Sequence, residues 1–105
     1  MPDDDFAQGA VTQGTPGLTP PKVQHMVQPK YTSDAMRAKI QGQVVVQILV
    51  ETDGAVSNAR IIEGLAPDLD EQALLAVKQW RFDPGMIDGR AVRVACFAIL
   101  EFRLH

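Results

Sequence analysis

The spacing of hydrophobic and polar positions changes several times along the 105-residue chain, and each change marks an expected element. Residues 43–51 alternate with a period of two, which is typical of a β-strand with one buried face. The members of that face are Val44, Val46, Ile48 and Val50. The dipeptide Asp53-Gly54 follows, and it favours a tight hairpin turn because glycine accepts a positive φ angle. Residues 55–64 are therefore predicted to return as the antiparallel partner strand.

Two helices are predicted, one before and one after this hairpin. Thr32 or Ser33 can cap a short first helix, which Gly42 ends. Residues 67–80 have a hydrophobic stripe at helical spacing, and Pro84 prevents this second helix from continuing. The residues of the stripe are Leu69, Ala73, Val77 and Trp80. This stripe predicts a helix packed on a sheet.

Residues 90–105 are predicted to form one long final strand after a turn at Asp88-Gly89. One face of this segment carries Val92, Val94, Cys96, Ala98, Leu100 and Phe102. The other face carries Arg93, Ala95, Phe97, Ile99, Glu101 and Arg103. Both faces are therefore apolar in the middle of the strand, whereas a sheet covered on one side only has a polar second face.

The expected fold is α+β: a three-stranded antiparallel sheet with two helices packed on one face, in the order α-β-β-α-β. It occupies residues 29–105. Residues 1–28 are rich in proline and glycine and have no regular period, so they are predicted to be a linker, partly disordered. The stretch VQHMVQP, residues 23–29, is compatible with an extended strand lying against the domain.

The charges and reactive side chains exclude several classes of protein. The net charge is −3 and no basic stripe is present, so we expect no nucleic-acid partner. His25, His105 and Cys96 have no metal-ligand spacing, and no catalytic motif occurs, so we expect no enzyme activity, metal or cofactor. Cys96 is interpreted as a small core residue. No apolar run is long enough to cross a bilayer, and no signal peptide is recognisable.

The sequence WRFDP, residues 80–84, concentrates large side chains at the end of the second helix. It is interpreted as a structural anchor of Trp80, Phe82 and Pro84, because Trp80 continues the buried stripe. An aromatic docking site is the alternative.

The final strand leaves two interpretations open. Either the linker or the first helix covers its second face, or the strand lies at a sheet edge and accepts an added strand from a partner. In the second case Arg93, Glu101 and Arg103 flank the apolar segment.

The ordered set of these motifs resembles the C-terminal domain of TonB-type energy transducers, over about residues 28–103. The resemblance rests on a Pro-x-Tyr start, the strand opening GQVVV, the Asp-Gly hairpin, the acidic-capped helix and its Trp-Arg-Phe-Asp-Pro end.

The resemblance implies a periplasmic domain joined by a spacer to an inner-membrane helix. Such domains bind the TonB box, an extended segment of outer-membrane transporters, as a strand added beside their last long strand. An inner-membrane proton-driven complex supplies the force for import through that pairing. The expected docking residues are Arg93, Val94, Ala95, Cys96, Phe97, Ala98 and Ile99.

Two other functions use the same edge. The domain can be an assembly module in which the edge pairs with a second copy, giving a homodimer by strand exchange. It can also be a sensory or regulatory module of a different membrane protein.

Overall fold

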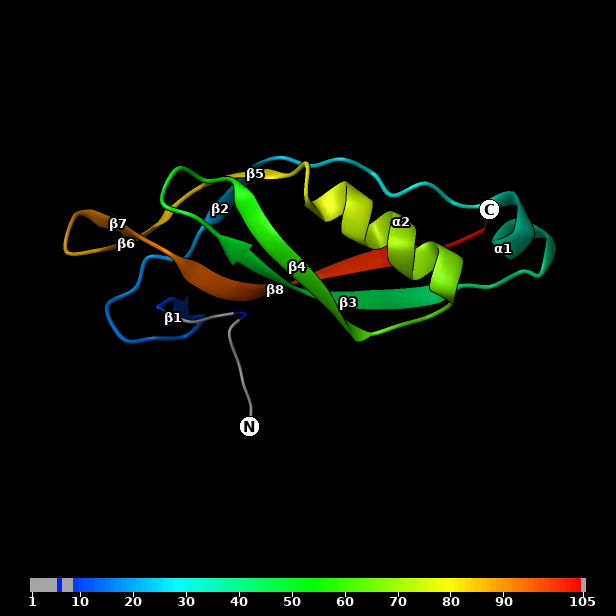
Figure 1. Cartoon of the computed structure of the whole chain (residues 1–105), viewed down its shortest axis with the longest axis horizontal. Coiled ribbons are helices and arrows are strands. Elements are labelled where there is room, and N and C mark those ends of the chain that lie inside the picture. Colours follow the sequence, from blue (N-terminus) through cyan, green and yellow to red (C-terminus); the bar gives the residue numbers. More distant parts are fainter. Residues whose placement is uncertain (1–5, 7–8, 105) are drawn as a thin grey trace.

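The computed structural model of the chain describes Phe6 and residues 9–104. Their Cα atoms span 49 × 33 × 20 Å, so the molecule is elongated (Figure 1). Residues 1–5, 7–8 and 105 lie outside the described part. The predictions that fall there, which are the start of the linker and the histidine that ends the final strand, are not addressed by the structure.

A four-stranded sheet forms the centre of the molecule, in the order β1-β8-β3-β4. Strands β3 (Gly42–Val50), β4 (Val56–Glu63) and β8 (Val94–Phe102) are antiparallel neighbours, as the sequence predicts. The two-residue strand β1 (Val11–Thr12) adds a fourth member, and it runs parallel to β8. The α+β class is therefore confirmed, and the sheet has one strand more than expected.

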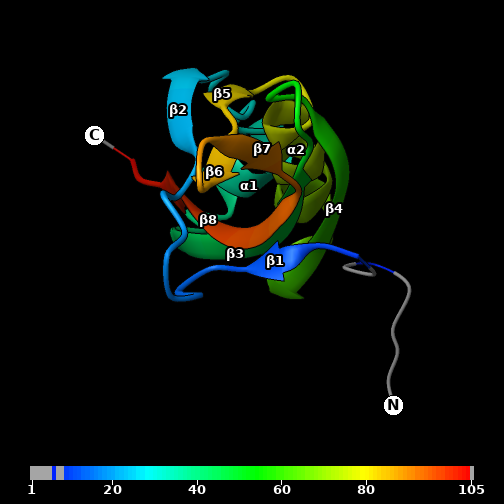
Figure 2. The ribbon, with the colours of Figure 1, turned by 90° about the vertical axis from the view of Figure 1, so that its left-hand side faces the viewer.

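Both helices lie on one side of the curved sheet (Figure 2). Helix α1 (Ser33–Arg37) begins after Thr32, whose Oγ1 accepts a hydrogen bond from the Ala35 N–H at 3.2 Å. It ends well before Gly42, because Lys39 adopts a left-handed conformation with φ 56°. The first helix is thus shorter than the sequence indicates.

Helix α2 (Pro67–Val77) packs against β3 and β4. Its N-cap is Ala66, which has no capping side chain, and Asp70 compensates. The Asp70 carboxylate accepts hydrogen bonds from the backbone N–H groups of Leu65 at 2.8 Å and Ala66 at 3.4 Å. The helix ends at Val77, so Trp80 follows the helix rather than closing it.

The core lies between α2 and the sheet and is made by the predicted faces. The four aliphatic residues of β3, alternate residues of β8 and the α2 stripe are buried together: Val44, Val46, Ile48, Val50, Leu69, Ala73, Val77, Val94, Cys96, Ala98, Leu100 and Phe102. At about 25 cal/mol per Å² of buried apolar surface, this layer supplies the main stabilisation of the domain.

Two small strand pairs extend the molecule beyond the central sheet. Strand β2 (Lys22–His25) pairs antiparallel with β5 (Arg81–Asp83), and β6 (Gly85–Ile87) pairs with β7 (Arg90–Val92). The single final strand predicted for 90–105 is therefore wrong at its start. Residues 90–92 belong to the β6–β7 hairpin, whereas the strand in the sheet begins at Val94 and ends at Phe102.

The β3–β4 turn is fixed against β5 by a close backbone approach. Gly54 has φ 87°, and a Cβ atom placed on it would lie 1.9 Å from the carbonyl oxygen of Phe82. The Phe82 N–H donates to the Gly54 carbonyl oxygen at 2.9 Å. Glycine is required here for both its conformation and its lack of a side chain.

The described part of the predicted linker follows the folded domain closely. It supplies β1 to the central sheet, and β2, which pairs with β5. In the connection between β1 and β2, Thr19 forms an isolated antiparallel β-bridge with Met86. Extended backbone can pair with an exposed edge without a hydrophobic period of its own, which is why the sequence pattern did not predict β1 and indicated for residues 23–29 only an extended strand against the domain.

Candidate functional site: the outer edge of β8

Strand β8 has one edge paired with β3 along its whole length, and its second edge faces outward. Residues of a strand alternate in the edge to which they present their N–H and C=O groups. The carbonyl oxygens of Arg93 and Ala95 accept hydrogen bonds from the Val11 N–H at 2.8 Å and the Gln13 N–H at 3.2 Å. Odd-numbered residues of β8 therefore present their backbone groups to the outer edge.

The first half of this outer edge is occupied by the N-terminal segment. Strand β1 pairs Val11 with Val94 and Thr12 with Ala95. One step further, the Phe97 N–H donates to Oε1 of Gln13 at 3.2 Å, so a side chain continues the pairing where the strand stops.

The second half of the outer edge is open. By the same alternation, Ile99 and Glu101 present their backbone N–H and C=O groups outward. In the part of the chain that the structure describes, no strand pairs with these residues on that side. An unpaired edge of this kind is a template for an added strand.

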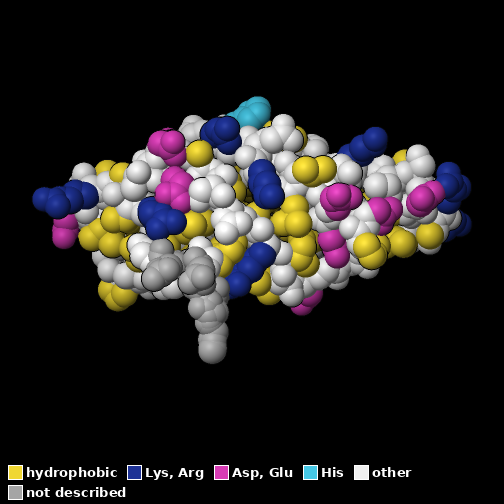
Figure 3. All heavy atoms as spheres, viewed as in Figure 1, with side chains coloured by type: hydrophobic (Ala, Val, Ile, Leu, Met, Phe, Trp, Pro, Cys, Tyr) yellow, Lys and Arg dark blue, Asp and Glu magenta, His cyan; other side chains and the backbone are white. Residues whose placement is uncertain are grey.

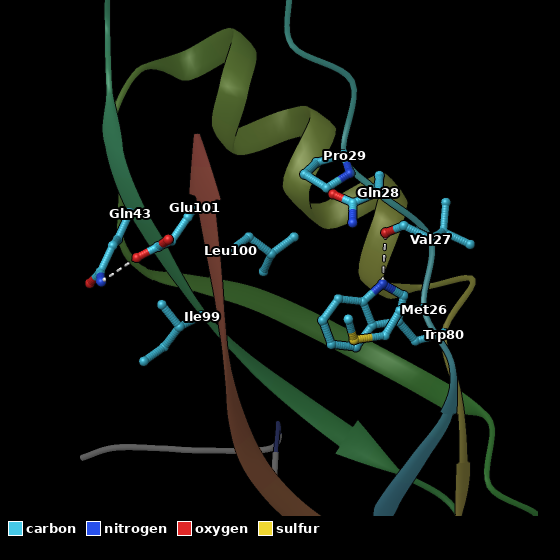
Figure 4. A pocket seen from close by; sticks show the side chains of 9 residues that line it. All are labelled: Met26, Val27, Gln28, Pro29, Gln43, Trp80, Ile99, Leu100 and Glu101. Carbon is cyan, nitrogen blue, oxygen red and sulfur yellow. Dashed lines mark hydrogen bonds between the residues drawn. The ribbon is translucent and has the colours of Figure 1, made fainter. Parts of the chain in front are cut away.

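A groove of about 540 Å³ runs along the open half. Residues 26–29 form one wall and residues 99–101 of β8 form the other, with Trp80 between them (Figure 4). A second cavity of about 220 Å³ adjoins Cys96, Phe97 and Ala98, and Pro20, Pro21 and Val23 form its far side. The outer edge of β8 is thus separated from residues 20–29 by a cleft.

Trp80 holds the far wall of this cleft in place. Its indole is only 8% exposed, and its Nε1–H donates to the Val27 carbonyl oxygen at 2.9 Å. The ring also lies 6.3 Å from that of Phe82 in β5, which pairs with β2. Pro84 lies between β5 and β6. Of the three residues interpreted from the sequence as an anchor, Trp80 lines both cavities and Phe82 lines the second, so these two lie beside the β8 edge.

The seven expected docking residues divide into two groups in the structure. Arg93 precedes β8, and the side chains of Val94, Ala95, Cys96 and Ala98 are buried. Phe97 and Ile99 are 53% and 59% exposed. Only these last two offer large apolar side chains to a partner, while the buried residues contribute backbone groups or position the strand.

An ion pair fixes the start of the edge. Nε of Arg93 lies 2.9 Å from Oε1 of Glu51 at the end of β3. The hydrogen bond from the Ser57 hydroxyl, and then the Arg93 guanidinium, hold the pKa of Glu51 below its usual value. This carboxylate stays ionised at neutral pH and keeps Arg93 beside β1.

The ionisable side chains near the site are few and give it little reactive character. Burial raises the pKa of the Cys96 thiol to about 11, so it is a neutral core group rather than a nucleophile. Among Phe6 and residues 9–104, no group of three His, Cys, Asp or Glu side chains converges as a metal site. Figure 3 shows acidic and basic side chains interspersed with hydrophobic ones, with no basic area on that face.

Sequence reasoning missed the far wall of the cleft and the extension of the open edge to Glu101. The stretch at 23–29 was expected only as a strand lying against the domain, and its place opposite β8 depends on the Trp80–Val27 hydrogen bond. The alternation of residues 93–103 places Glu101 in register with Ile99, so it indicates that both residues present their backbone groups to the same edge. The sequence pattern does not reveal where β1 ends, and the end of β1 determines which residues of that edge are open.

The fold and the site define the class: a small α+β domain with a strand edge beside a cleft that Trp80 lines. Residues 27–104 match the family described as Gram-negative bacterial TonB protein C-terminal. Because this match covers most of the chain, the chain belongs to the TonB C-terminal family.

Similar proteins agree with this assignment. The chain is 30% identical over 100 residues to Protein TonB of Vibrio cholerae, covering 94% of this chain and 41% of that protein. It is 36% identical over 59 residues to Protein TonB of Escherichia coli, covering 55% of this chain and 25% of that protein. The chain therefore spans less than half the length of these relatives.

A solved structure has the same fold. The solution NMR structure of the Pseudomonas aeruginosa TonB CTD superposes with a TM-score of 0.65, covering 90% of this chain and 94% of that one, at 21% identity. Within the described residues, no helix is long and apolar enough to cross a membrane.

Proposed function

We propose that the domain binds the TonB box of outer-membrane transporters by strand addition along the outer edge of β8 and transmits proton-motive force through that pairing. In this role it is the periplasmic end of an inner-membrane-anchored transducer, and upstream segments contact the proton-channel complex. The observation that carries the proposal is the open half of the β8 edge, facing a groove of about 540 Å³.

Several features of the site support an extended peptide as the occupant. Backbone groups of Ile99 and Glu101 supply the pairing, and the exposed side chains of Phe97 and Ile99 supply apolar contact. The wall at residues 26–29 lies opposite, so the guest is contacted from two sides (Figure 4). Peptide capture by an exposed sheet edge works through these two kinds of contact.

The energies predict a transient complex. Pairing of seven residues forms about six backbone hydrogen bonds, each worth roughly 0.5–1.5 kcal/mol net. Ordering a flexible peptide costs about 1–2 kcal/mol per residue. Backbone pairing alone therefore cannot give tight binding, and contacts to Phe97 and Ile99 must add to it. We expect an affinity in the micromolar range.

The test is a titration of the ¹⁵N-labelled chain with synthetic TonB-box peptides from transporters of the same genome. We expect amide shifts at residues 93–101 and at residues 26–29, with little change on the exposed face of α2. Isothermal titration gives the affinity. Absence of shifts with every such peptide, or shifts confined to β4, would contradict the proposal, and nanomolar affinity would contradict backbone pairing as its main source.

A further inference from the structure

Two described parts of the N-terminal segment, Phe6 and residues 11–13, contact the central sheet. The Phe6 ring lies 4.6 Å from the guanidinium carbon of Arg60 in β4, at the opposite edge of the sheet. At β8, Val11 and Gln13 donate their N–H groups to the carbonyl oxygens of Arg93 and Ala95. Residues 11–13 therefore lie in the position that a guest strand would take.

The contacts of residues 11–13 with β8 are those of an added edge strand. They include two backbone hydrogen bonds, at 2.8 and 3.2 Å, the ladder pairing of β1 with Val94 and Ala95, and one bond from the Phe97 N–H to the Gln13 side chain at 3.2 Å. The strand contains only two residues, and the side chains of Thr12 and Gln13 are exposed. So few bonds, with little burial, compete closely with the entropy of the released segment.

We propose that residues 11–13 are a built-in competitor for the outer edge of β8: they occupy Arg93–Phe97 in the free domain and must detach before a guest strand can pair there. This inference rests on the proposed function, and it concerns the regulation of that same edge. The open half at Ile99–Glu101 is where a guest makes its first contacts, and displacement of β1 then extends the pairing toward Arg93.

Two substitutions remove the competitor's bonds without touching β8. Val11→Pro deletes the N–H that donates to the Arg93 carbonyl, and Gln13→Ala deletes the acceptor of the Phe97 N–H. Thr12→Pro is the matched control, because its N–H makes no bond to β8 in the described structure. Gln24→Ala is a second control, since it removes a bond of the same segment to Asp83 in β5 instead, at 2.6 Å.

Hydrogen exchange on the full chain tests the occupied state with no guest present. The amides of Val11, Gln13 and Phe97 are expected to be protected, and the Ile99 amide is expected to exchange faster. Val11→Pro and Gln13→Ala should speed the exchange of Phe97, while Gln24→Ala should not. Equal exchange of Phe97 and Ile99 in the unaltered chain would overturn the inference.

Two guests then test competition: a transporter TonB-box peptide and a synthetic peptide of residues 9–15. Each should bind Val11→Pro and Gln13→Ala roughly two- to tenfold more tightly than the unaltered chain, the factor that one or two hydrogen bonds supply. Thr12→Pro and Gln24→Ala should bind like the unaltered chain.

The two guests separate the two proposals. If the transporter peptides bind no chain, yet the peptide of residues 9–15 still binds the substituted chains more tightly, the proposed function is wrong and the competitor stands. If the peptide of residues 9–15 binds no chain, or binds all chains alike, the competitor is excluded whatever the transporter peptides do.

Discussion

The two halves of the outer edge of β8 have the same backbone geometry but different occupants. From Arg93 to Phe97 the edge is paired with residues 11–13, and from Ile99 to Glu101 it faces a groove of about 540 Å³. One strand edge thus has a half that is paired with another segment of the chain and a half that is not paired within the described residues. The difference teaches that the availability of a sheet edge depends on distant chain segments and not on the strand itself.

The walls beside the two halves also differ. The open half faces residues 26–29, which Trp80 holds through Val27, whereas the occupied half is flanked by the Arg93–Glu51 ion pair. A buried aromatic side chain contributes several kcal/mol, and a partly exposed ion pair contributes about 0–1 kcal/mol. The contact of Trp80, beside the open half, therefore contributes more to stability than the ion pair beside the occupied half.

Replacement of the main support of the open half should have the largest effect. Trp80→Ala removes a side chain that is only 8% exposed and lines both cavities. We expect the free energy of unfolding to fall by about 3–5 kcal/mol, measured by urea denaturation. Trp80→Phe, which loses the Val27 hydrogen bond but keeps most of the ring, should cost about 1–2 kcal/mol. Equal losses for the two variants would show that the indole N–H, rather than packing, holds this wall.

The β3–β4 turn supports the same wall through β5 and β2. Gly54→Ala places a Cβ atom 1.9 Å from the Phe82 carbonyl oxygen at φ 87°, so we expect a loss of roughly 2–4 kcal/mol by urea denaturation. Gly89→Ala is the matched control, with φ 78° and no atom within 4 Å, and it should cost less. Equal losses would mean that the conformation alone matters and that the contact with β5 does not.

A proline in the open half should weaken guest binding while leaving the fold intact. Ile99→Pro deletes an N–H that faces the outer edge, and the pairing with β3 does not use this group. We expect transporter-peptide affinity to fall about tenfold in isothermal titration, with a stability change below about 1 kcal/mol. Ile99→Ala keeps the N–H and separates the side chain's contribution. Unchanged affinity in Ile99→Pro would place the guest elsewhere.

The ion pair beside the occupied half should have the smallest effect. The pKa of Glu51 is lowered in the folded chain, so its stabilisation is present above its ordinary pKa near 4.5 and is lost as the pH falls through the folded value. Glu51→Gln should remove this part of the pH dependence, less than about 1 kcal/mol, between about pH 5 and pH 3. Urea midpoints across this range measure it. A Glu51→Gln chain that loses as much stability on acidification as the unaltered chain would exclude this carboxylate as the cause.

Several elements were predictable from the sequence because their signals are local. The alternation of Val44, Val46, Ile48 and Val50, the Asp53-Gly54 turn and the stripe on 67–80 each specify a buried face or a turn within a few residues. The core and the antiparallel pairing of β3 with β4 followed from these patterns, whereas the place of β8 beside β3 did not. Helix ends were less predictable: α1 ends at Arg37, before Gly42, and α2 ends at Val77, before Trp80.

The sequence by itself determined the core, the α+β class and the strand that carries the site, because hydrophobic burial has a period that the chain displays. Tertiary structure alone decided which part of that strand is open. Pairing of β1 with β8 and of β2 with β5 depends on backbone hydrogen bonds between segments more than 50 residues apart, and β2 leads into the wall at residues 26–29. Backbone groups are the same in every residue apart from proline, so no side-chain pattern records these partners.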